Sequence, residues 1–171
     1  RLGPNQSVNL ASNVTGTLPI ANGGTALTSG FVNGGVNTPA FSVTQGSGQD
    51  LANATATKLA FNTEVFDTDS AFDHSSNYRF TVPSGEAGKY FFYAQATLQA
   101  TQDADANSIF FYKNGSSFQS TMNTNQYYDT SEISIVMDLS AGDYIEVYFE
   151  HNRGTTDDVA NGRWYGCKLI T

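Results

Sequence analysis

The sequence predicts an all-β sandwich or barrel of roughly eight to ten strands. Apolar residues come in short runs separated by turn signals, and no helical periodicity is sustained along the chain. The aromatic content is high, with 12 Phe, 9 Tyr and 1 Trp in 171 residues, and Ser, Thr, Asn and Gly fill much of the remainder. This composition is typical of strands and turns around an aromatic core.

The first 38 residues differ from the rest and predict an extended stem. They contain no Asp or Glu, a single aromatic residue (Phe31), and aliphatic residues at uneven spacing. Alone, such a segment cannot offset an ordering entropy of about 1–2 kcal/mol per residue. Several copies wound together could point the aliphatic side chains at a shared axis, as in a fibrous shaft. We therefore expect a stem over residues 1–38 and a folded head over residues 39–171.

The elements of the head are predicted from apolar runs bounded by turn residues. Strands are expected over residues 40–45, 57–66, 78–83, 89–100, 107–113, 117–121, 132–138, 144–151 and 163–170. The turns between them carry the usual chemistry at Pro83-Ser84-Gly85, Asn114-Gly115, Ala141-Gly142-Asp143 and Asn161-Gly162.

The strand YIEVYFEH, residues 144–151, has one face for a core and one for solvent. Glu146 and Glu150 alternate there with Val147 and Phe149, which is the pattern of a half-buried strand in an outer sheet.

Two other strands carry apolar side chains on both faces. GKYFFYAQATL (88–98) and RWYGCKLI (163–170) leave a second apolar face that a two-sheet sandwich cannot cover. Another subunit is the simplest cover, so an interface is predicted at Phe91, Tyr93, Trp164 and Tyr165. The alternative is that loops of the same chain cover these rings.

Six motifs follow one another through the head: AFSV (40–43), KLAFNTEVFDT (58–68), YRFTVPSGEAGKYFF (78–92), FFYKNGSSF (110–118), LSAGDYIEVYF (139–149) and WYGCKLI (164–170). Their order and spacing resemble those of the globular domain of complement C1q, a relative of tumour necrosis factor. The resemblance implies a ten-strand jelly-roll sandwich that forms homotrimers, with an inner sheet facing the threefold axis.

The stem has a resemblance of its own. The collagen repeat that usually precedes such heads is absent, and NVTGTLPIANGGTALTSG (13–30) instead resembles segments found before the distal head of phage tail fibres. Ala26 stands where those segments commonly have Gly. Together the two resemblances imply the tip of a tail fibre on a virion, attached to an upstream shaft. Such a head would bind a host cell-surface receptor, expected to be a polysaccharide. The alternatives are a purely structural trimerisation head and a secreted C1q-like adhesion module that binds a protein ligand.

Two polar segments are candidates for receptor binding. SSFQSTMNTNQYYDTSE (116–132) surrounds tyrosines with amides and hydroxyls, which suit sugar hydroxyls and a sugar face, although a polar loop with one Tyr in the core would look the same. In RGTTDDVANGR (153–163), two arginines flank an acidic pair. The arginines could form an ion pair with these carboxylates, or they could bind an anionic sugar. The candidates are Asn123, Asn125, Gln126, Tyr127, Tyr128, Arg153 and Arg163.

Several function classes are disfavoured. The net charge of −8 opposes general nucleic-acid binding, and no apolar run approaches the roughly 18 residues of a membrane span. Cys167 is the single cysteine, so no intrachain disulfide can form. His74 and His151 are expected at the surface and lie in no nucleophile motif, so no enzymatic activity is predicted. Glycan hydrolysis by paired carboxylates is a weaker alternative.

No cofactor is required, but calcium is possible. Carboxylate and amide oxygens are the ligands that calcium prefers. The candidate ligands are Asp103, Asp105, Asp157 and Asp158, together with Asn107 or Asn161.

Overall fold

The computed structural model describes residues 37–99, 106–124 and 130–170, so the predicted stem lies almost wholly outside the described residues. The described head is all-β. Its strands are β1 (Ala40–Thr44), β2 (Gln49–Leu51), β3 (Thr57–Lys58), β4 (Thr63–Asp67), β5 (Phe72–Asp73), β6 (Arg79–Thr81), β7 (Gly88–Leu98), β8 (Asn107–Lys113), β9 (Ser116–Asn123), β10 (Thr130–Leu139), β11 (Tyr144–His151) and β12 (Asp157–Ile170).

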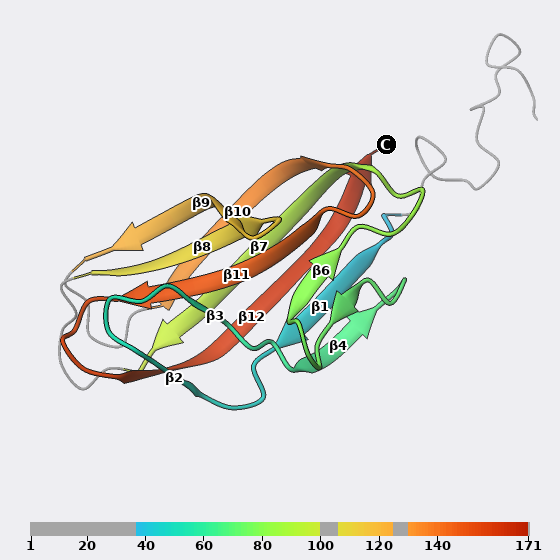
Figure 1. Ribbon diagram of the computed structural model, residues 1–171. Helices are drawn as coiled ribbons and strands as arrows, with labels where there is room; N and C mark the ends of the chain where they lie inside the picture. Colours follow the sequence, from blue (N-terminus) through green and yellow to red (C-terminus); the bar gives the residue numbers. More distant parts are fainter. Residues whose placement is uncertain (1–36, 100–105, 125–129, 171) are drawn as a thin grey trace, which may run out of the picture. The chain divides into compact units, whose positions relative to one another are not determined.

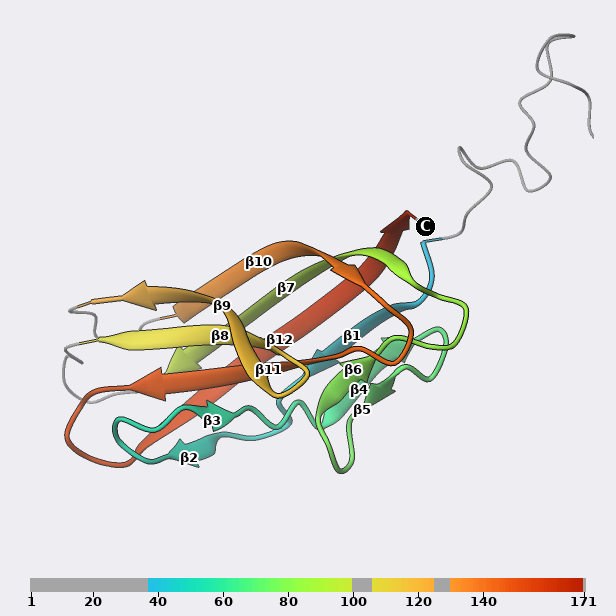
Figure 2. The same ribbon diagram turned by 45° about the horizontal axis from the view of Figure 1, so that its top comes forward.

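The strands form two antiparallel sheets, named here after their central strands. The β12 sheet has the order β10-β7-β12-β1-β4, with β2 also paired to β12. The β11 sheet has the order β5-β6-β11-β8-β9, with β3 also paired to β11. Figures 1 and 2 show these sheets as two layers, with β8, β9 and β11 in one and β7, β10 and β12 in the other. The predicted jelly-roll sandwich is confirmed.

An aromatic cluster fills the space between the layers. The Trp164 ring meets the Phe41 and Phe72 rings edge-on, with centroid distances of 5.2 and 5.0 Å. Phe41 also stacks on Phe80 at 5.1 Å. Each buried ring removes a large apolar area from water, so a chain with few aliphatic residues still builds a continuous core.

The sequence predicts the bounds of two strands of the β11 sheet correctly. β8 and β11 begin and end where the sequence predicts, and Ile145, Val147 and Phe149 of β11 are fully buried. The predicted turn at Asn114-Gly115 is also confirmed: both residues have positive φ, 52° and 78°, as a two-residue hairpin requires.

The β12 strand is longer than predicted because a turn signal inside it marks a bulge. Asn161-Gly162 was expected to be a turn, but Asn161 takes a φ of 55° within the strand and the pairing with β7 shifts between Ala160 and Arg163. The strand therefore begins at Asp157. The predicted strand 57–66 divides into β3 and β4, and the short strands β2 and β5 were not predicted.

The strands with two apolar faces behave differently on each face. Tyr90 and Phe92 of β7 are fully buried, whereas Phe91 and Tyr93 lie half-buried on the outer side of the β12 sheet. The prediction of Trp164 at a subunit interface is wrong: its ring has no exposed surface, because this side of β12 faces the core of its own chain.

Candidate functional site

The outward face of the β12 sheet carries a row of aromatic and hydroxyl side chains. In the strand register, Tyr165 lies between Ser42 and Tyr93. The row continues to Phe66 on β4 and to Ser134 on β10. The Tyr93 and Tyr165 rings stack with centroids 4.9 Å apart. Because β10 and β4 are the outer strands in the order of this sheet, the row crosses the sheet from one edge to the other.

A neighbouring row on the same face is apolar. Cys167 lies between Ala40 and Phe91, and Phe91 lies opposite Val136. Burial raises the pKa of the Cys167 thiol, so the thiol form is favoured and the side chain behaves as a small apolar group. Val136 is 54% exposed and Tyr165 is 41% exposed.

Most of the large apolar side chains that the described residues leave exposed belong to strands of this sheet. Only Phe118 and Met122, both on β9, belong to the other sheet. The remainder are Val65, Phe66, Val136, Tyr165, Leu169 and Ile170. Loops of the described head therefore do not cover this face, and its exposed apolar side chains remain open to another molecule.

One end of this face is polar. The Tyr93 hydroxyl lies 2.8 Å from Glu132 Oε2 and 2.9 Å from Gln95 Oε1. Burial, together with the hydrogen bond to Glu132, raises the pKa of Tyr93 to about 12. Arg163, a predicted receptor-binding residue, lies exposed next to this group, opposite Gln95 and Thr44.

The structure places one residue of the first receptor-binding segment. Asn123 ends β9, and its amide nitrogen lies 3.3 Å from Ser131 Oγ and 3.5 Å from the carbonyl oxygen of Thr130. Ser131 in turn donates to Asn107 Oδ1. Asn123 therefore links β9 to β10. The other predicted residues of this segment lie outside the described residues: Asn125, Gln126, Tyr127 and Tyr128.

The second segment contains the internal ion pair that was one of its two interpretations. Arg153 Nη1 lies 2.5 Å from Asp157 Oδ1, and the Arg153 side chain is only 5% exposed. The backbone N–H groups of Arg153 and Gly154 donate to Asn53 Oδ1 at 2.7 and 2.6 Å. Arg153 is thus held within the fold, while Arg163 faces outward from β12.

The described residues do not bring a calcium ligand set together. Asp157 and Asp158 are neighbours in β12 and point to opposite faces of the strand, and Asp157 is paired with Arg153. In the described parts of the chain, no group of three or more His, Cys, Asp or Glu side chains could hold a metal. Asp103 and Asp105 lie outside those parts.

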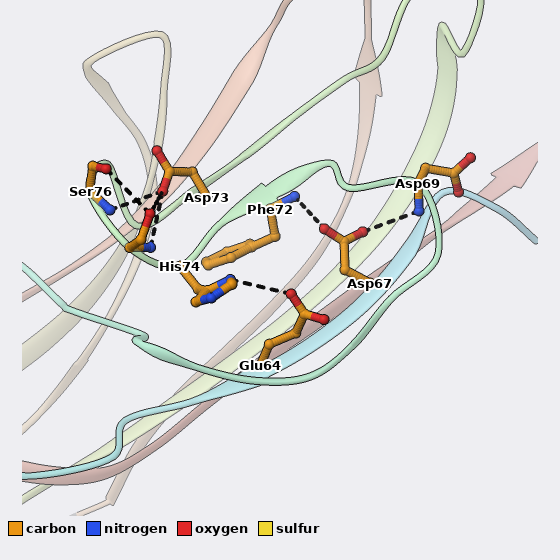
Figure 3. Close-up of polar contacts among 8 residues, drawn as sticks. Glu64, Asp67, Asp69, Phe72, Asp73, His74 and Ser76 are labelled. Carbon is orange, nitrogen blue, oxygen red and sulfur yellow. Dashed lines mark hydrogen bonds and ion pairs between the residues drawn. The ribbon is translucent and has the colours of Figure 1, made fainter.

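A further acidic segment, between β4 and β6, uses its carboxylates to shape the loop (Figure 3). Asp73 Oδ1 accepts hydrogen bonds from the backbone N–H groups of Ser75 and Ser76 at 3.0 and 2.9 Å. The bond from Ser76 is the main reason that the pKa of Asp73 lies well below its ordinary value. Asp67 Oδ2 accepts from the Phe72 N–H at 2.8 Å.

The two histidines lie in different settings. His74 is partly exposed, and its Nδ1 lies 3.2 Å from Glu64 Oε2 (Figure 3). His151 was expected at the surface, and that expectation is wrong: the side chain is buried, with Nε2 3.0 Å from the carbonyl oxygen of Leu51. The reason is its place in β11, where it shares the inward face with Val147 and Phe149. Neither of these histidine contacts pairs a base with a nucleophile.

Sequence reasoning missed an aromatic group on the outward face of the β11 sheet. The Tyr112 and Tyr148 rings stack with centroids 3.9 Å apart, and the Arg79 guanidinium lies 4.3 Å from the centre of the Tyr144 ring. The alternation in YIEVYFEH places Tyr144 and Tyr148 on the face of Glu146. The alternation therefore indicated that the two tyrosines share a face, but the glutamates on the same face led to its interpretation as a solvent-exposed face only.

Solved structures with a similar fold come from different kinds of protein. The globular domain of zebrafish complement 1qA protein has a TM-score of 0.58 at 18% identity, covering 78% of this chain and 97% of that one. Murine APRIL at pH 5.0 has a TM-score of 0.59 at 13% identity, covering 76% and 98%. PRD1 vertex protein P5 has a TM-score of 0.62 at 14% identity, covering 80% and 100%.

Among the described residues, no helix has the length and hydropathy of a membrane span.

The remaining comparisons concern sequence. No curated protein matches the chain. The model of the C1q domain matches residues 40–165, which include β1 to β11 and more than half of β12. The chain therefore belongs to the C1q domain family.

Proposed function

We propose that the chain is the homotrimeric head of a phage tail fibre, that it has no enzymatic activity, and that it binds a polysaccharide on the host surface. The observation that carries the trimer is the exposed outward face of the β12 sheet, where Val136 and Tyr165 are 54% and 41% exposed. Two copies of such a face, or three around an axis, would remove these side chains from water.

The stem supports the placement on a fibre. Residues 13–30 resemble tail-fibre segments that precede a distal head. The similarity of fold to PRD1 vertex protein P5 agrees with a role on a virion surface. A head at the end of a fibre is presented to the host cell, which suits attachment.

Charge limits the kind of receptor. Each chain carries −8, so a trimer carries 3 × −8 = −24. A strongly acidic polysaccharide would be repelled by this surface at low salt, so a neutral glycan is favoured. Three copies in one head, with several fibres on a particle, would turn weak single contacts into firm attachment.

The test combines solution mass with cell binding. Light scattering on the intact chain should give a mass near three times 18.4 kDa, and a calcium chelator will show whether a metal contributes to the assembly. Fluorescently labelled head should then bind selected strains in a panel of bacteria, with periodate oxidation of the cell-surface glycans abolishing binding. A stable monomer would contradict the trimer.

The alternative is a head that only trimerises the fibre. The exposed outward face of the β12 sheet favours it, because this face would account for a trimer without any receptor. In that case the head should form a trimer but bind no strain of the panel. Retained binding after periodate oxidation, with loss after protease treatment of the cells, would instead indicate a protein ligand.

A further inference from the structure

The outward face of the β11 sheet carries four aromatic side chains from two neighbouring strands. β8 and β11 lie side by side in this layer (Figures 1 and 2). The register places Tyr148 opposite Phe110, and the alternation of β11 puts Tyr144 on the same face. We call Phe110, Tyr112, Tyr144 and Tyr148 the tyrosine surface; all four are partly exposed.

Three of the four rings of the tyrosine surface contact one another. Tyr112 and Tyr148 are stacked at 3.9 Å with 21° between their planes, and Phe110 meets Tyr112 edge-on at 6.2 Å. Burial and the neighbouring groups, first among them Glu146, raise the pKa of Tyr148 above its ordinary value. The phenol is therefore neutral and can both donate and accept a hydrogen bond.

These phenols have hydrogen-bonding capacity that the head does not use. Within the described residues, the hydroxyls of Tyr112, Tyr144 and Tyr148 have no hydrogen-bond partner. This distinguishes them from the other tyrosines whose hydroxyls are bonded, since Tyr90 donates to the carbonyl oxygen of Glu86 and Tyr93 contacts Glu132. The three free hydroxyls lie together on one face and are available to a ligand.

The charged groups around the tyrosine surface include no excess of cations. Lys58, opposite Tyr148, pairs with Glu146 at 3.0 Å, and Arg79 stacks over Tyr144. Glu150 is the remaining carboxylate on this face of β11. Asp73 on β5 lies opposite Arg79 and adds a third carboxylate. Two cations and three carboxylates give this face no excess of positive charge that could attract a polyanion or fix an anionic group.

We propose that the tyrosine surface binds pyranose rings of a neutral glycan. Aromatic rings can pack against the C–H face of a sugar, while phenol, ammonium, guanidinium and carboxylate groups exchange hydrogen bonds with its hydroxyls. A protein partner is less suited to this face, because a protein interface needs a continuous apolar centre and the larger exposed apolar side chains lie mainly on the β12 sheet. The proposal rests on the proposed function and assigns its glycan site to a face that subunit contacts through the β12 sheet leave open.

The experiment probes the intact head on a printed array of neutral oligosaccharides and of oligosaccharides bearing carboxylate or sulfate. The variants are Tyr112→Ala, Tyr148→Ala and the double variant Tyr112→Phe/Tyr148→Phe, which keeps both rings and removes only the hydroxyls. Ser84→Ala is the control, because Ser84 lies in the exposed turn after β6, outside the tyrosine surface and outside the strands of the β12 sheet. Light scattering and urea unfolding of every variant establish that the fold and the assembly are retained.

The wild-type head should bind neutral members of the array and prefer them to acidic ones. Each Tyr→Ala variant should weaken the binding about tenfold or more, as expected for an aromatic side chain at the centre of a contact. The double Phe variant should weaken it less, and Ser84→Ala should not change it. If one Ala variant fails to fold, the double Phe variant still tests the hydroxyls.

Three outcomes would overturn the proposal. If the wild-type head binds neutral glycans and the folded tyrosine variants bind them equally well, the tyrosine surface is not the site. The proposed function would then remain intact. A preference for acidic members would refute the neutral ligand. Binding to bacteria without any binding to glycans on the array, and without sensitivity to periodate, would refute both the site and the polysaccharide receptor.

Discussion

At the turn between β10 and β11, Asp143 links three neighbouring groups. Its Oδ1 accepts from Asn114 Nδ2 at 2.7 Å, its Oδ2 accepts from the Ser140 N–H at 2.9 Å, and Lys113 Nζ lies 2.9 Å from the same Oδ2. These bonds, led by the one from Asn114, lower the pKa of Asp143 from 3.8 to about 2.

The folded carboxyl is therefore harder to protonate than the unfolded one, and its contribution to stability has a defined pH window. The contribution is complete above the unfolded value of 3.8 and is lost as the pH falls toward 2. We expect Asp143→Asn to lower the free energy of unfolding at pH 7 by about 1 kcal/mol, because solvent screens the pair with Lys113.

Urea unfolding at pH 7 and at pH 2.5 measures this prediction. The difference between Asp143→Asn and the wild type should shrink at the lower pH, where the wild-type carboxyl is largely protonated in the unfolded chain. Asp138→Asn is the control: its side chain is 75% exposed and contacts Lys89 at 3.3 Å, so its removal should change stability by less than about 0.5 kcal/mol. A difference at Asp143 that does not change with pH would contradict the assignment.

Gly166 is required by close packing between β12 and β7. A Cβ added there would lie 2.4 Å from Phe92 Cδ1 and 2.9 Å from the backbone oxygen of Phe91. Since Phe92 is fully buried and the backbone cannot retreat, Gly166→Ala should lower the free energy of unfolding by about 1–3 kcal/mol. Gly46→Ala is the matched control, because its Cβ would meet the exposed side chains of Thr63 and Asn62. Equal effects of the two substitutions in urea unfolding would contradict this account.

At the scale of elements, the sequence predicts a strand well when an apolar and aromatic run is bounded by turn residues. β8 and β11 have the predicted bounds because Asn114-Gly115 follows the one and Ala141-Gly142-Asp143 precedes the other. β2 and β5 have three and two residues, too few for any period to be detected. In β12, the Asn161-Gly162 dipeptide has the same local chemistry in a bulge as in a turn, so only pairing with β7 distinguishes them.

The bulge in β12 gives a prediction at this scale. Asn161 holds a φ of 55°, which Asn and Gly adopt readily and β-branched residues do not. Asn161→Val should therefore lower the free energy of unfolding by about 1–2 kcal/mol, while Asn161→Gly should be close to neutral. Thermal or urea unfolding measures both. Equal stability of the Val and Gly variants would show that the bulge is not held by this residue.

At the scale of the whole molecule, the sequence predicts which strands have two apolar faces but not which face turns inward. Trp164 and Tyr165 are neighbours in β12, and only the packing of the two sheets places Trp164 in the core and leaves Tyr165 41% exposed. The tyrosine surface escaped prediction for a related reason. Tyr112 and Tyr148 are 36 positions apart in the sequence, and the register of β8 with β11 brings them together.

The trimer is best tested by a charge placed on the outward face of the β12 sheet. Val136 is 54% exposed, so Val136→Lys should change the stability of a single chain by less than about 0.5 kcal/mol. In an assembly that covers this face, the same lysine would be buried next to Phe91 without a partner, which costs several kcal/mol per subunit.

We therefore expect Val136→Lys to remain folded by circular dichroism while light scattering shows a shift from trimer to monomer. Ser84→Lys, in the exposed turn after β6, adds the same charge away from this face and should leave the trimer intact. A trimeric Val136→Lys head would mean that subunits meet through another surface. Because attachment through three copies depends on assembly, a folded monomer should also lose most of its binding to cells even though its tyrosine surface is unchanged.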